Sequence, residues 1–359
     1  MWKTKNTKRD RVFFGHGGHE MPQFVHLHIH SEFSLLDGAN RIKDLPVRAK
    51  ELGMNAIAIT DHGVMYGAID FYKACKKEGV KPIIGCEVYV APRSRHDKEP
   101  NLDNRYNHLI LLAKDNKGYQ NLSKLVSIGF TEGYYYKPRI DLEVLEKYHE
   151  GLICLSACLA GSVNQALLNG QTEKAEEIAL WHKKVFGEDY YIEIQNNGLK
   201  EQVLANQKLV QLARKLDIPL VATNDAHYLK REDAYNHEIL LCIQTGKRMS
   251  DEDRMRFETD ELYVKSPEEM SEYFAAFPDA IENTVKIADK CNVDFEFLYN
   301  NLLQKLFYAI MQFLQPFLSA HLIKLDLLNQ LNMHLNILNL RDIVLIPLNL
   351  FLVYNNTLL

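Results

Sequence analysis

The sequence predicts an α/β fold, a seven-stranded β/α barrel of the TIM type, followed by a helical segment. Two observations predict it. Short apolar, β-branched runs alternate with helix-like runs between residues 24 and 230, and from residue 231 the pattern becomes helical. Repeated β-then-α units favour a mainly parallel sheet, either open or closed into a barrel. The presence of seven strand-like runs favours the barrel.

The strand-like runs are short and rich in β-branched residues. They are FVHLH (24–28), AIAIT (56–60), PIIGCEVYV (82–90), NHLILLA (107–113), GLICLSA (151–157), DYYIEIQ (189–195) and IPLVATN (218–224). The helix-like runs that separate several of them cover residues 42–53, 66–79, 171–186 and 200–216. The first two helices are predicted to end on Gly53 and Gly79, because glycine is typical of helix ends.

The chain is expected to divide into four parts. Residues 21–230 form the barrel, and residues 231–297 form the helical segment. Residues 1–20 are expected to be a disordered leader. Residues 298–359 are dominated by Leu and Asn and contain no Gly and no Glu, so we hypothesise that this tail is aberrant or out-of-frame sequence.

The helical segment carries clear start signals. Ser266 is a good N-cap, Pro267 suits the first turn, and Glu268 and Glu269 suit the positive end of the helix dipole. Pro278 is predicted to start a further helix.

Composition excludes several classes of protein. The 359 residues include 42 basic and 47 acidic ones, a net charge of −5, so any contact with DNA must be local. The six cysteines form no CxxC pair, which is typical of reduced thiols and indicates a cytoplasmic protein. The basic start has no apolar core of a signal peptide, and the tail has no clean stretch of about 20 apolar residues, so no membrane partner is expected.

Three histidines alternate at the start of the barrel. His26, His28 and His30 are expected to share one face, because successive side chains of a strand point to opposite faces. His28 and His30 then lie about 6.6 Å apart at Cα, near enough to reach one metal cluster. Two histidines alone are a weak signal, and a strand with a polar face is the alternative.

Similar groups recur where other strands end, which strengthens the metal interpretation. In α/β barrels, functional groups project from the carboxyl ends of the strands. Glu87 lies inside an apolar strand, where a lone carboxylate is costly unless it is paired, protonated or metal-bound. The candidate ligands are His28, His30, Asp37, His62, Glu87, His108, Cys158, Asp225 and His227.

This set of residues predicts two or three divalent ions. Imidazole, carboxylate and thiolate ligands suit Zn²⁺, Mn²⁺ or Fe²⁺, and Mg²⁺ is possible. One tetrahedral ion needs about four ligands, and two or more ions close together are suited to phosphoester hydrolysis. The alternative is a set of unrelated core and surface residues. Taken alone, Asp37 is typical of a turn, and Cys158 is typical of a small buried apolar side chain.

The motifs HLHIHS, TDHG, GCEVYV, NHLILLA and NDAHY together resemble the polymerase and histidinol phosphatase (PHP) family. The resemblance implies a distorted β/α barrel of the PHP type around a trinuclear metal centre. It implies that all the candidates above are ligands, with Glu87 as a bridging carboxylate and Asp61 as a supporting residue. His26 is not a ligand in the family pattern, and we expect it to support the ligands from beneath, on the same face.

Longer motifs resemble the alpha-subunit family of bacterial replicative DNA polymerases. They are FVHLHIHSEFSLLDGA, GYYYKPRID, LSACLAG and IQTGKRMSDEDRMRFETDELYVKSPEEM, within a match from residue 21 to residue 297. The resemblance implies a DNA-replication protein of the nucleotidyltransferase class, with DNA, a sliding clamp and a proofreading subunit as partners. Because the match ends before the polymerase palm, the chain is expected to be an amino-terminal fragment without the polymerase active site.

The activity expected of this fragment is that of a metal-dependent 3′–5′ exonuclease or phosphoesterase, with His62, Glu87 and Asp225 as catalytic residues. Lys137 and Arg139, in YYYKPR, have the composition that stacks bases and holds a DNA backbone, although a packed loop is equally compatible. Two alternatives are a small-molecule phosphatase that acts on something like histidinol phosphate, and a non-catalytic scaffold stabilised by metal.

Overall fold

The computed structural model describes residues 23–295 and residue 297. The described residues up to Phe295 belong to one compact unit. The leader expected at residues 1–20 and the tail expected at residues 298–359 lie outside the described residues. Within the described part of the chain, no helix combines the length and the apolar character needed to cross a bilayer.

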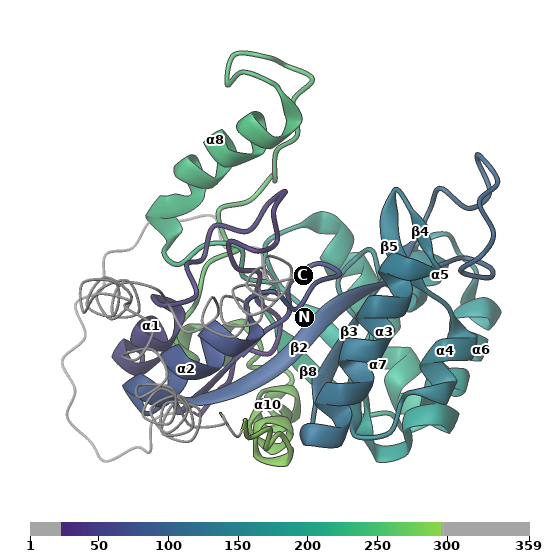
Figure 1. The fold of residues 1–359 in the computed structure, drawn as a ribbon, viewed down its shortest axis with the longest axis horizontal. Helices are drawn as coiled ribbons and strands as arrows, with labels where there is room; N and C mark the ends of the chain where they lie inside the picture. The colour runs from purple at the N-terminus through teal and green to yellow at the C-terminus, as the bar shows by residue number, and fades with distance from the viewer. Residues whose placement is uncertain (1–22, 296, 298–359) are drawn as a thin grey trace, which may run out of the picture. The chain divides into compact units, whose positions relative to one another are not determined.

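A mixed sheet of eight strands forms the wall of the fold (Figure 1). Its order is β4-β5-β2-β3-β6-β7-β8, and β1 pairs with β2 beside that path. The strands are β1 (Ala56–Ile59), β2 (Lys81–Val90), β3 (Asn107–Ala113), β4 (Tyr134–Tyr135), β5 (Lys137–Ile140), β6 (Leu152–Leu155), β7 (Tyr190–Gln195) and β8 (Leu220–Thr223). Most of their side chains are buried, as expected where helices cover one face and a packed interior covers the other.

The extended segment 24–31 connects the two edges of this sheet. On one side, His26 O accepts a hydrogen bond from Ala58 N of β1 (2.9 Å). On the other side, Ala226, just after β8, donates to His28 O (3.1 Å) and accepts from His30 N (2.9 Å). The segment and the strands β1, β2, β3, β6, β7 and β8 therefore form the predicted seven-stranded barrel.

One strand of the barrel runs against its neighbours. β3 is antiparallel to both β2 and β6, whereas the pairs β1–β2, β6–β7 and β7–β8 are parallel. The mainly parallel sheet expected from the sequence is therefore distorted at this strand. The reversal places the amino end of β3, where His108 lies, beside Tyr89 at the carboxyl end of β2.

Helices cover the outside of the barrel (Figure 1), and their apolar faces contribute to the largest of the three hydrophobic clusters in the described residues. They are α1 (Leu45–Glu51), α2 (Ala68–Glu78), α3 (Asn116–Thr131), α4 (Leu142–Lys147), α5 (Ser162–Leu168), α6 (Thr172–Phe186) and α7 (Lys200–Leu216). α2 ends on the predicted Gly79, whose φ of +73° is a conformation that glycine adopts without strain.

Three more helices follow the barrel strands. They are α8 (Ala234–Thr245), which projects from the barrel in Figure 1, α9 (Pro267–Tyr273) and α10 (Pro278–Lys290). α9 has the predicted N-cap: Ser266 Oγ accepts from Glu269 N (3.2 Å), and Glu269 Oε2 accepts from Ser266 N (2.8 Å). Short 3₁₀ turns span Gly187–Asp189 and Arg231–Asp233.

Helix α10 closes the base of the barrel. Ile287 packs with Val25 in the second hydrophobic cluster, which fills the barrel interior. Thr284 Oγ1 accepts a hydrogen bond from Val25 N (3.1 Å), and Asn283 Nδ2 donates to Leu220 O (2.8 Å). Because Val25 and Leu220 lie at the amino ends of their strands, α10 covers the end of the barrel opposite to the carboxyl ends of the parallel strands.

Replacing Ile287 by alanine is expected to lower the free energy of unfolding by about 2–5 kcal/mol, the usual cost of removing a large aliphatic side chain from a packed core. Ile287 is fully buried and belongs to the second hydrophobic cluster. Urea denaturation measures the change. Asp289→Ala, at an exposed position of the same helix, is the matched control and should change the free energy by less than about 0.5 kcal/mol. Equal effects of the two variants would contradict the packing of α10 as the base.

Candidate metal centre

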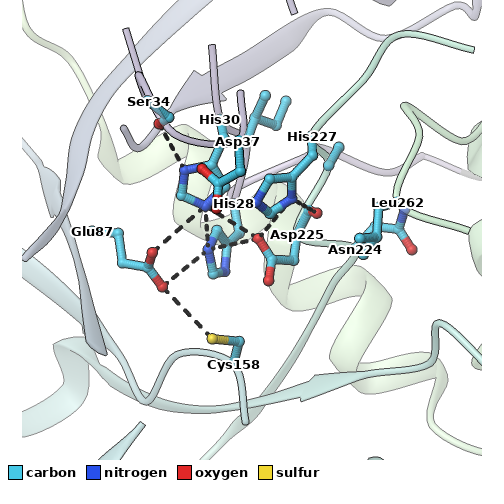
Figure 2. Close-up of polar contacts among 12 residues, drawn as sticks. His28, His30, Ser34, Asp37, Glu87, Cys158, Asn224, Asp225, His227 and Leu262 are labelled. Carbon is cyan, nitrogen blue, oxygen red and sulfur yellow. Dashed lines mark hydrogen bonds and ion pairs between the residues drawn. The ribbon is translucent and has the colours of Figure 1, made fainter. Parts of the chain in front are cut away.

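Nine side chains with metal-binding atoms meet at one end of the barrel. They come from the first segment (His28, His30), the loop after it (Asp37), the chain just after β1 and β6 (His62, Cys158), the inside of β2 (Glu87), the amino end of β3 (His108) and the loop after β8 (Asp225, His227). Figure 2 shows the heart of this cluster, with imidazole, carboxylate and thiol groups turned toward one another. The fold thus brings together every residue that the sequence analysis named as a candidate ligand, and their role as ligands stays a prediction.

An extra residue in the first segment redirects its side chains. Ala58 N donates to His26 O, and Thr60 N donates to Ile29 O (2.9 Å each). Between these two hydrogen bonds the chain advances by two residues along β1 and its end, but by three residues along the first segment. This spacing of two residues against three is a β-bulge, which shifts the alternation of side chains along the bulged strand.

The bulge makes the prediction for His26 wrong. Leu27 and His28 both point to the inner side of the segment, Leu27 into the interior cluster and His28 toward Glu87. His26 therefore lies on the opposite side of the segment from His28. His26 Nε2 instead contacts the backbone oxygen of Lys265 (2.9 Å), and its ring packs edge-on against Phe24 at 4.8 Å between centroids. His26 is therefore a buried structural residue on the outer side of the barrel wall, and it does not support the ligands from beneath.

Glu87 lies at the centre of the cluster. Its Oε1 is 2.9 Å from His108 Nδ1 and 3.4 Å from His28 Nε2. Its Oε2 is 2.5 Å from His62 Nδ1 and 3.6 Å from His30 Nε2. The carboxylate is fully buried. A carboxylate whose two oxygens face different imidazoles fits the bridging role that the resemblance implies.

Two more carboxylates and a thiol complete the cluster. Asp225 Oδ1 lies 3.1 Å from His30 Nε2, and Asp37 Oδ2 lies 3.8 Å from His227 Nε2. Cys158 Sγ is 3.8 Å from the central carboxylate. These groups surround the imidazoles on several sides, so the cluster alternates anionic and imidazole donors.

The loop that carries Asp225 is held by a later segment of the chain. Asp225 has a φ of +50°, which is uncommon for a residue other than glycine. On either side of it, Asn224 Nδ2 donates to Tyr263 O (2.7 Å) and His227 N donates to Leu262 O (2.7 Å). These hydrogen bonds from the stretch between α8 and α9 stabilise the strained loop in one conformation.

The donor set fits divalent metal ions. Three groups of residues each bring their ligand atoms within 4.8 Å of one another: His30, His62 and His227; His28, His30 and Glu87; and His62, Glu87 and His108. Among the described residues, four buried atoms of the cluster make no hydrogen bond of acceptable geometry, namely Asp37 Oδ1, His62 Nδ1, Glu87 Oε2 and Asp225 Oδ1. Buried polar atoms are normally satisfied, so converging donor atoms of this kind are typical of a metal site.

The charges of the cluster shift the pKa values of its members. Burial alone would lower the pKa of His62, but the carboxylates of Glu87 and Asp37 raise it to about 10. Burial alone would raise the pKa of Glu87, but the imidazoles of His108, His62 and His28 hold it well below its usual value. Imidazolium and carboxylate charges therefore balance each other here, and divalent cations can take the place of the imidazolium protons.

Asp61 occupies the supporting position that the resemblance implies. Its Oδ1 accepts hydrogen bonds from Ser31 N (2.6 Å) and Ser34 Oγ (2.7 Å). Ser34 Oγ in turn lies 3.0 Å from His30 Nδ1 (Figure 2). Asp61 thus orients a hydroxyl that holds one of the candidate ligands, and it does not itself face the centre.

The sequence analysis missed a second buried carboxylate, Glu193 of β7. Its Oε1 lies 2.7 Å from His28 Nδ1, on the side of the ring that faces away from the centre. The signal that could have found it is the one that identified Glu87, a carboxylate inside an apolar strand, here DYYIEIQ.

Of the two basic residues predicted to hold DNA, only Lys137 lies near the centre. Its Nζ is 5.4 Å from the centre of the Tyr89 ring, which stacks on His62 at 6.0 Å between centroids. Arg139 is fully buried, and its guanidinium donates to four backbone oxygens. The acceptors belong to Arg95, Asp97, Asp103 and Gly133. The prediction for Arg139 is therefore wrong, because its cation organises a packed loop and cannot face a phosphate.

The sequence matches curated proteins over most of the described residues. Residues 26–197 match the family described as the PHP domain. The chain is 52% identical over 278 residues to DNA polymerase III subunit alpha of Borreliella burgdorferi, which covers 77% of this chain and 24% of that protein. It is 48% identical over 282 residues to the subunit of the same name from Thermus aquaticus, covering 76% and 23%. The chain thus spans about a quarter of the length of these relatives.

Solved structures give more distant matches. An amidohydrolase from Chromobacterium violaceum aligns with a TM-score of 0.39 at 14% identity, over 56% of this chain and 87% of that one. A putative metal-dependent phosphoesterase from Bifidobacterium adolescentis aligns with a TM-score of 0.36 at 13% identity, over 58% and 89%. The family assignment rests on the sequence matches: the chain carries a PHP domain, and it is similar over about three quarters of its length to DNA polymerase III alpha subunits.

Proposed function

We propose that this chain hydrolyses phosphodiester bonds at the 3′ end of DNA, with two or three divalent ions held by the nine-residue cluster. The observation that carries the proposal is the convergence of nine donor side chains, from seven separate stretches of chain, around one fully buried carboxylate. Clusters that hold two or more ions are suited to phosphoester hydrolysis. Similarity to DNA polymerase III alpha subunits supports DNA as the substrate.

The cluster has a closed side and an open side. The side chains of His28, His30 and Glu87 are fully buried, whereas those of His62, His108 and Asp225 retain 15%, 15% and 14% exposure. Substrate would therefore approach past these three partly exposed side chains. Bound divalent ions would supply Lewis-acid charge to the phosphate and lower the pKa of a water molecule. Glu87 would hold the cluster together from within, and His62 and Asp225 would act next to the substrate.

A local surface beside the open side suits single-stranded DNA. Lys137 follows Tyr134 and Tyr136, whose side chains are 51% and 67% exposed. Exposed aromatic rings stack on bases, and a neighbouring ammonium group holds the backbone. A small contact of this kind agrees with the overall net charge of −5, which provides no broad basic surface.

We also propose that the chain takes part in DNA replication in the cytoplasm, because its relatives are DNA polymerase subunits. Nucleotide transfer, and contacts with a sliding clamp and a proofreading subunit, are proposals for the whole-length protein. The described residues carry only the hydrolytic proposal.

Removing metal is expected to lower the thermal stability of the protein. Ions that bind only the folded state stabilise it by about 4 kcal/mol at a thousandfold excess over their Kd. Elemental analysis of the purified chain should find two or three ions, and a chelator followed by dialysis should lower Tm. Adding back Zn²⁺ or Mn²⁺ should restore it. A chain that holds no ions and keeps its Tm in chelator would contradict the metal centre.

His62→Ala and Asp225→Ala are expected to lower DNA hydrolysis at least about a hundredfold, a typical effect of losing a metal ligand or its support. The assay follows release of label from 3′-labelled single-stranded DNA with Mn²⁺ or Zn²⁺. His96→Ala removes an exposed imidazole and is the matched control, which should retain activity. Equal release by all three variants would assign the activity to a contaminant and defeat the hydrolase proposal.

The same samples separate the two alternatives. Turnover of histidinol phosphate, with no release from DNA, would identify a small-molecule phosphatase. Bound ions with no turnover of either substrate would identify a metal-stabilised scaffold.

Lys137→Ala is expected to raise the KM for single-stranded DNA about fivefold and leave kcat unchanged, because about 1 kcal/mol of uniform binding is lost. Steady-state kinetics on the labelled substrate measure both constants. Lys98→Ala, on the loop before β3, is the matched control with the same change in net charge. An unchanged KM for Lys137→Ala would remove this residue from the DNA-binding surface.

A further inference from the structure

We propose that Glu193 is a positioning residue that fixes the orientation and tautomer of His28, so that His28 Nε2 is available to a metal ion. The inference rests on the metal-dependent function proposed above. It concerns a residue behind the centre, which neither the sequence motifs nor the family match identifies.

The two nitrogens of His28 face opposite environments. Nδ1 lies 2.7 Å from Glu193 Oε1, while Nε2 lies 3.2 Å from Asp225 Oδ1 and 3.4 Å from Glu87 Oε1. A carboxylate can only accept, so Nδ1 carries the hydrogen in this contact. With the hydrogen on Nδ1, a neutral ring presents the lone pair of Nε2 to the centre.

Glu193 is itself held rigidly. Its Oε1 accepts hydrogen bonds from Gln195 Nε2 (2.9 Å) and Thr223 Oγ1 (2.5 Å). Its backbone N donates to Ser156 Oγ (2.9 Å). Glu193 is only 1% exposed. A buried carboxylate is costly unless it is paired, and the imidazole of His28 is the partner that compensates the charge of Glu193.

His28 differs in this respect from the neighbouring histidines of the centre. The outer nitrogen of His30 contacts the hydroxyl of Ser34 (3.0 Å), and that of His227 contacts the backbone oxygen of Asp225 (2.8 Å). Only His28 has a charged partner that lies outside the nine-residue cluster, within the described part of the chain. A carboxylate behind a metal-binding imidazole raises the basicity of the ring and fixes its orientation.

Glu193→Gln tests this role with almost no change in shape. The amide nitrogen of glutamine can donate to Nδ1, which would move the ring hydrogen to Nε2 and block the metal. We expect one ion to bind about 10–100-fold more weakly, the usual effect of losing such a partner, with the other ions affected much less. Calorimetric titration of Zn²⁺ into the metal-stripped full chain measures the number of ions and their Kd values.

Thr223→Val is the matched control. It removes a hydrogen bond to the same carboxylate oxygen but leaves the charge that faces His28. Its Zn²⁺ affinity should stay within about threefold of the original, and the metal-free Tm of both variants should show that they fold. Unchanged Zn²⁺ affinity in Glu193→Gln would overturn the proposal, as would an equal loss in Thr223→Val, which would show a merely structural role. A starting protein that binds no Zn²⁺ would overturn both this inference and the proposed function, whereas normal binding with an unaffected Glu193→Gln would overturn this inference alone.

Discussion

The buried charge of Glu87 is the constraint on which the rest of the site depends. An isolated carboxylate in a protein interior costs on the order of several kcal/mol, so Glu87 requires cationic partners on all sides. The imidazoles of His28, His30, His62 and His108 surround it from three separate stretches of chain. These stretches meet only when the barrel closes, so compensation of this charge and closure of the barrel are one event. Metal ions that bind the same atoms would then stabilise the closed barrel itself.

Two departures from a regular barrel bring the partners to that carboxylate. The reversal of β3 places His108 at the carboxyl ends of the neighbouring strands, an end that a parallel strand would reach only with its last residue. The β-bulge between His26 and Ile29 lets the first segment place Leu27 in the apolar interior and the next residue in the centre. Regular strands would leave an imidazole in the apolar layer, where its polar nitrogens would lack partners. The distortion of the fold is therefore a requirement of the site.

Much of this site could be predicted from the sequence, because its residues lie at the ends of clearly apolar strands. The predictions that failed concern the direction in which particular side chains point. Alternation predicted a common face for His26 and His28, but a β-bulge is set by hydrogen bonds to another strand and leaves no mark in the alternation. Arg139 lies in a stretch, YYYKPR, whose composition is typical of a DNA contact. Its actual partners are backbone oxygens of a loop whose path the sequence does not reveal. Glu193, like Glu87, is a carboxylate inside an apolar strand, which is a usable signal, but none of the recognised motifs includes it.

The barrel interior changes character in layers, and this order explains how the site can be both stable and accessible. Helix α10 seals the base, and an apolar layer that includes Leu27 and Ile110 lies above it. Glu193, Gln195 and Thr223 then form a buried polar layer, which exchanges hydrogen bonds internally and holds the ligand layer from below. Within the ligand layer, His62, His108 and Asp225 retain partly exposed side chains, and substrate would meet the layer there. Residues on the closed side can therefore govern how tightly ions are bound, while those on the open side govern which substrates can reach the bound ions.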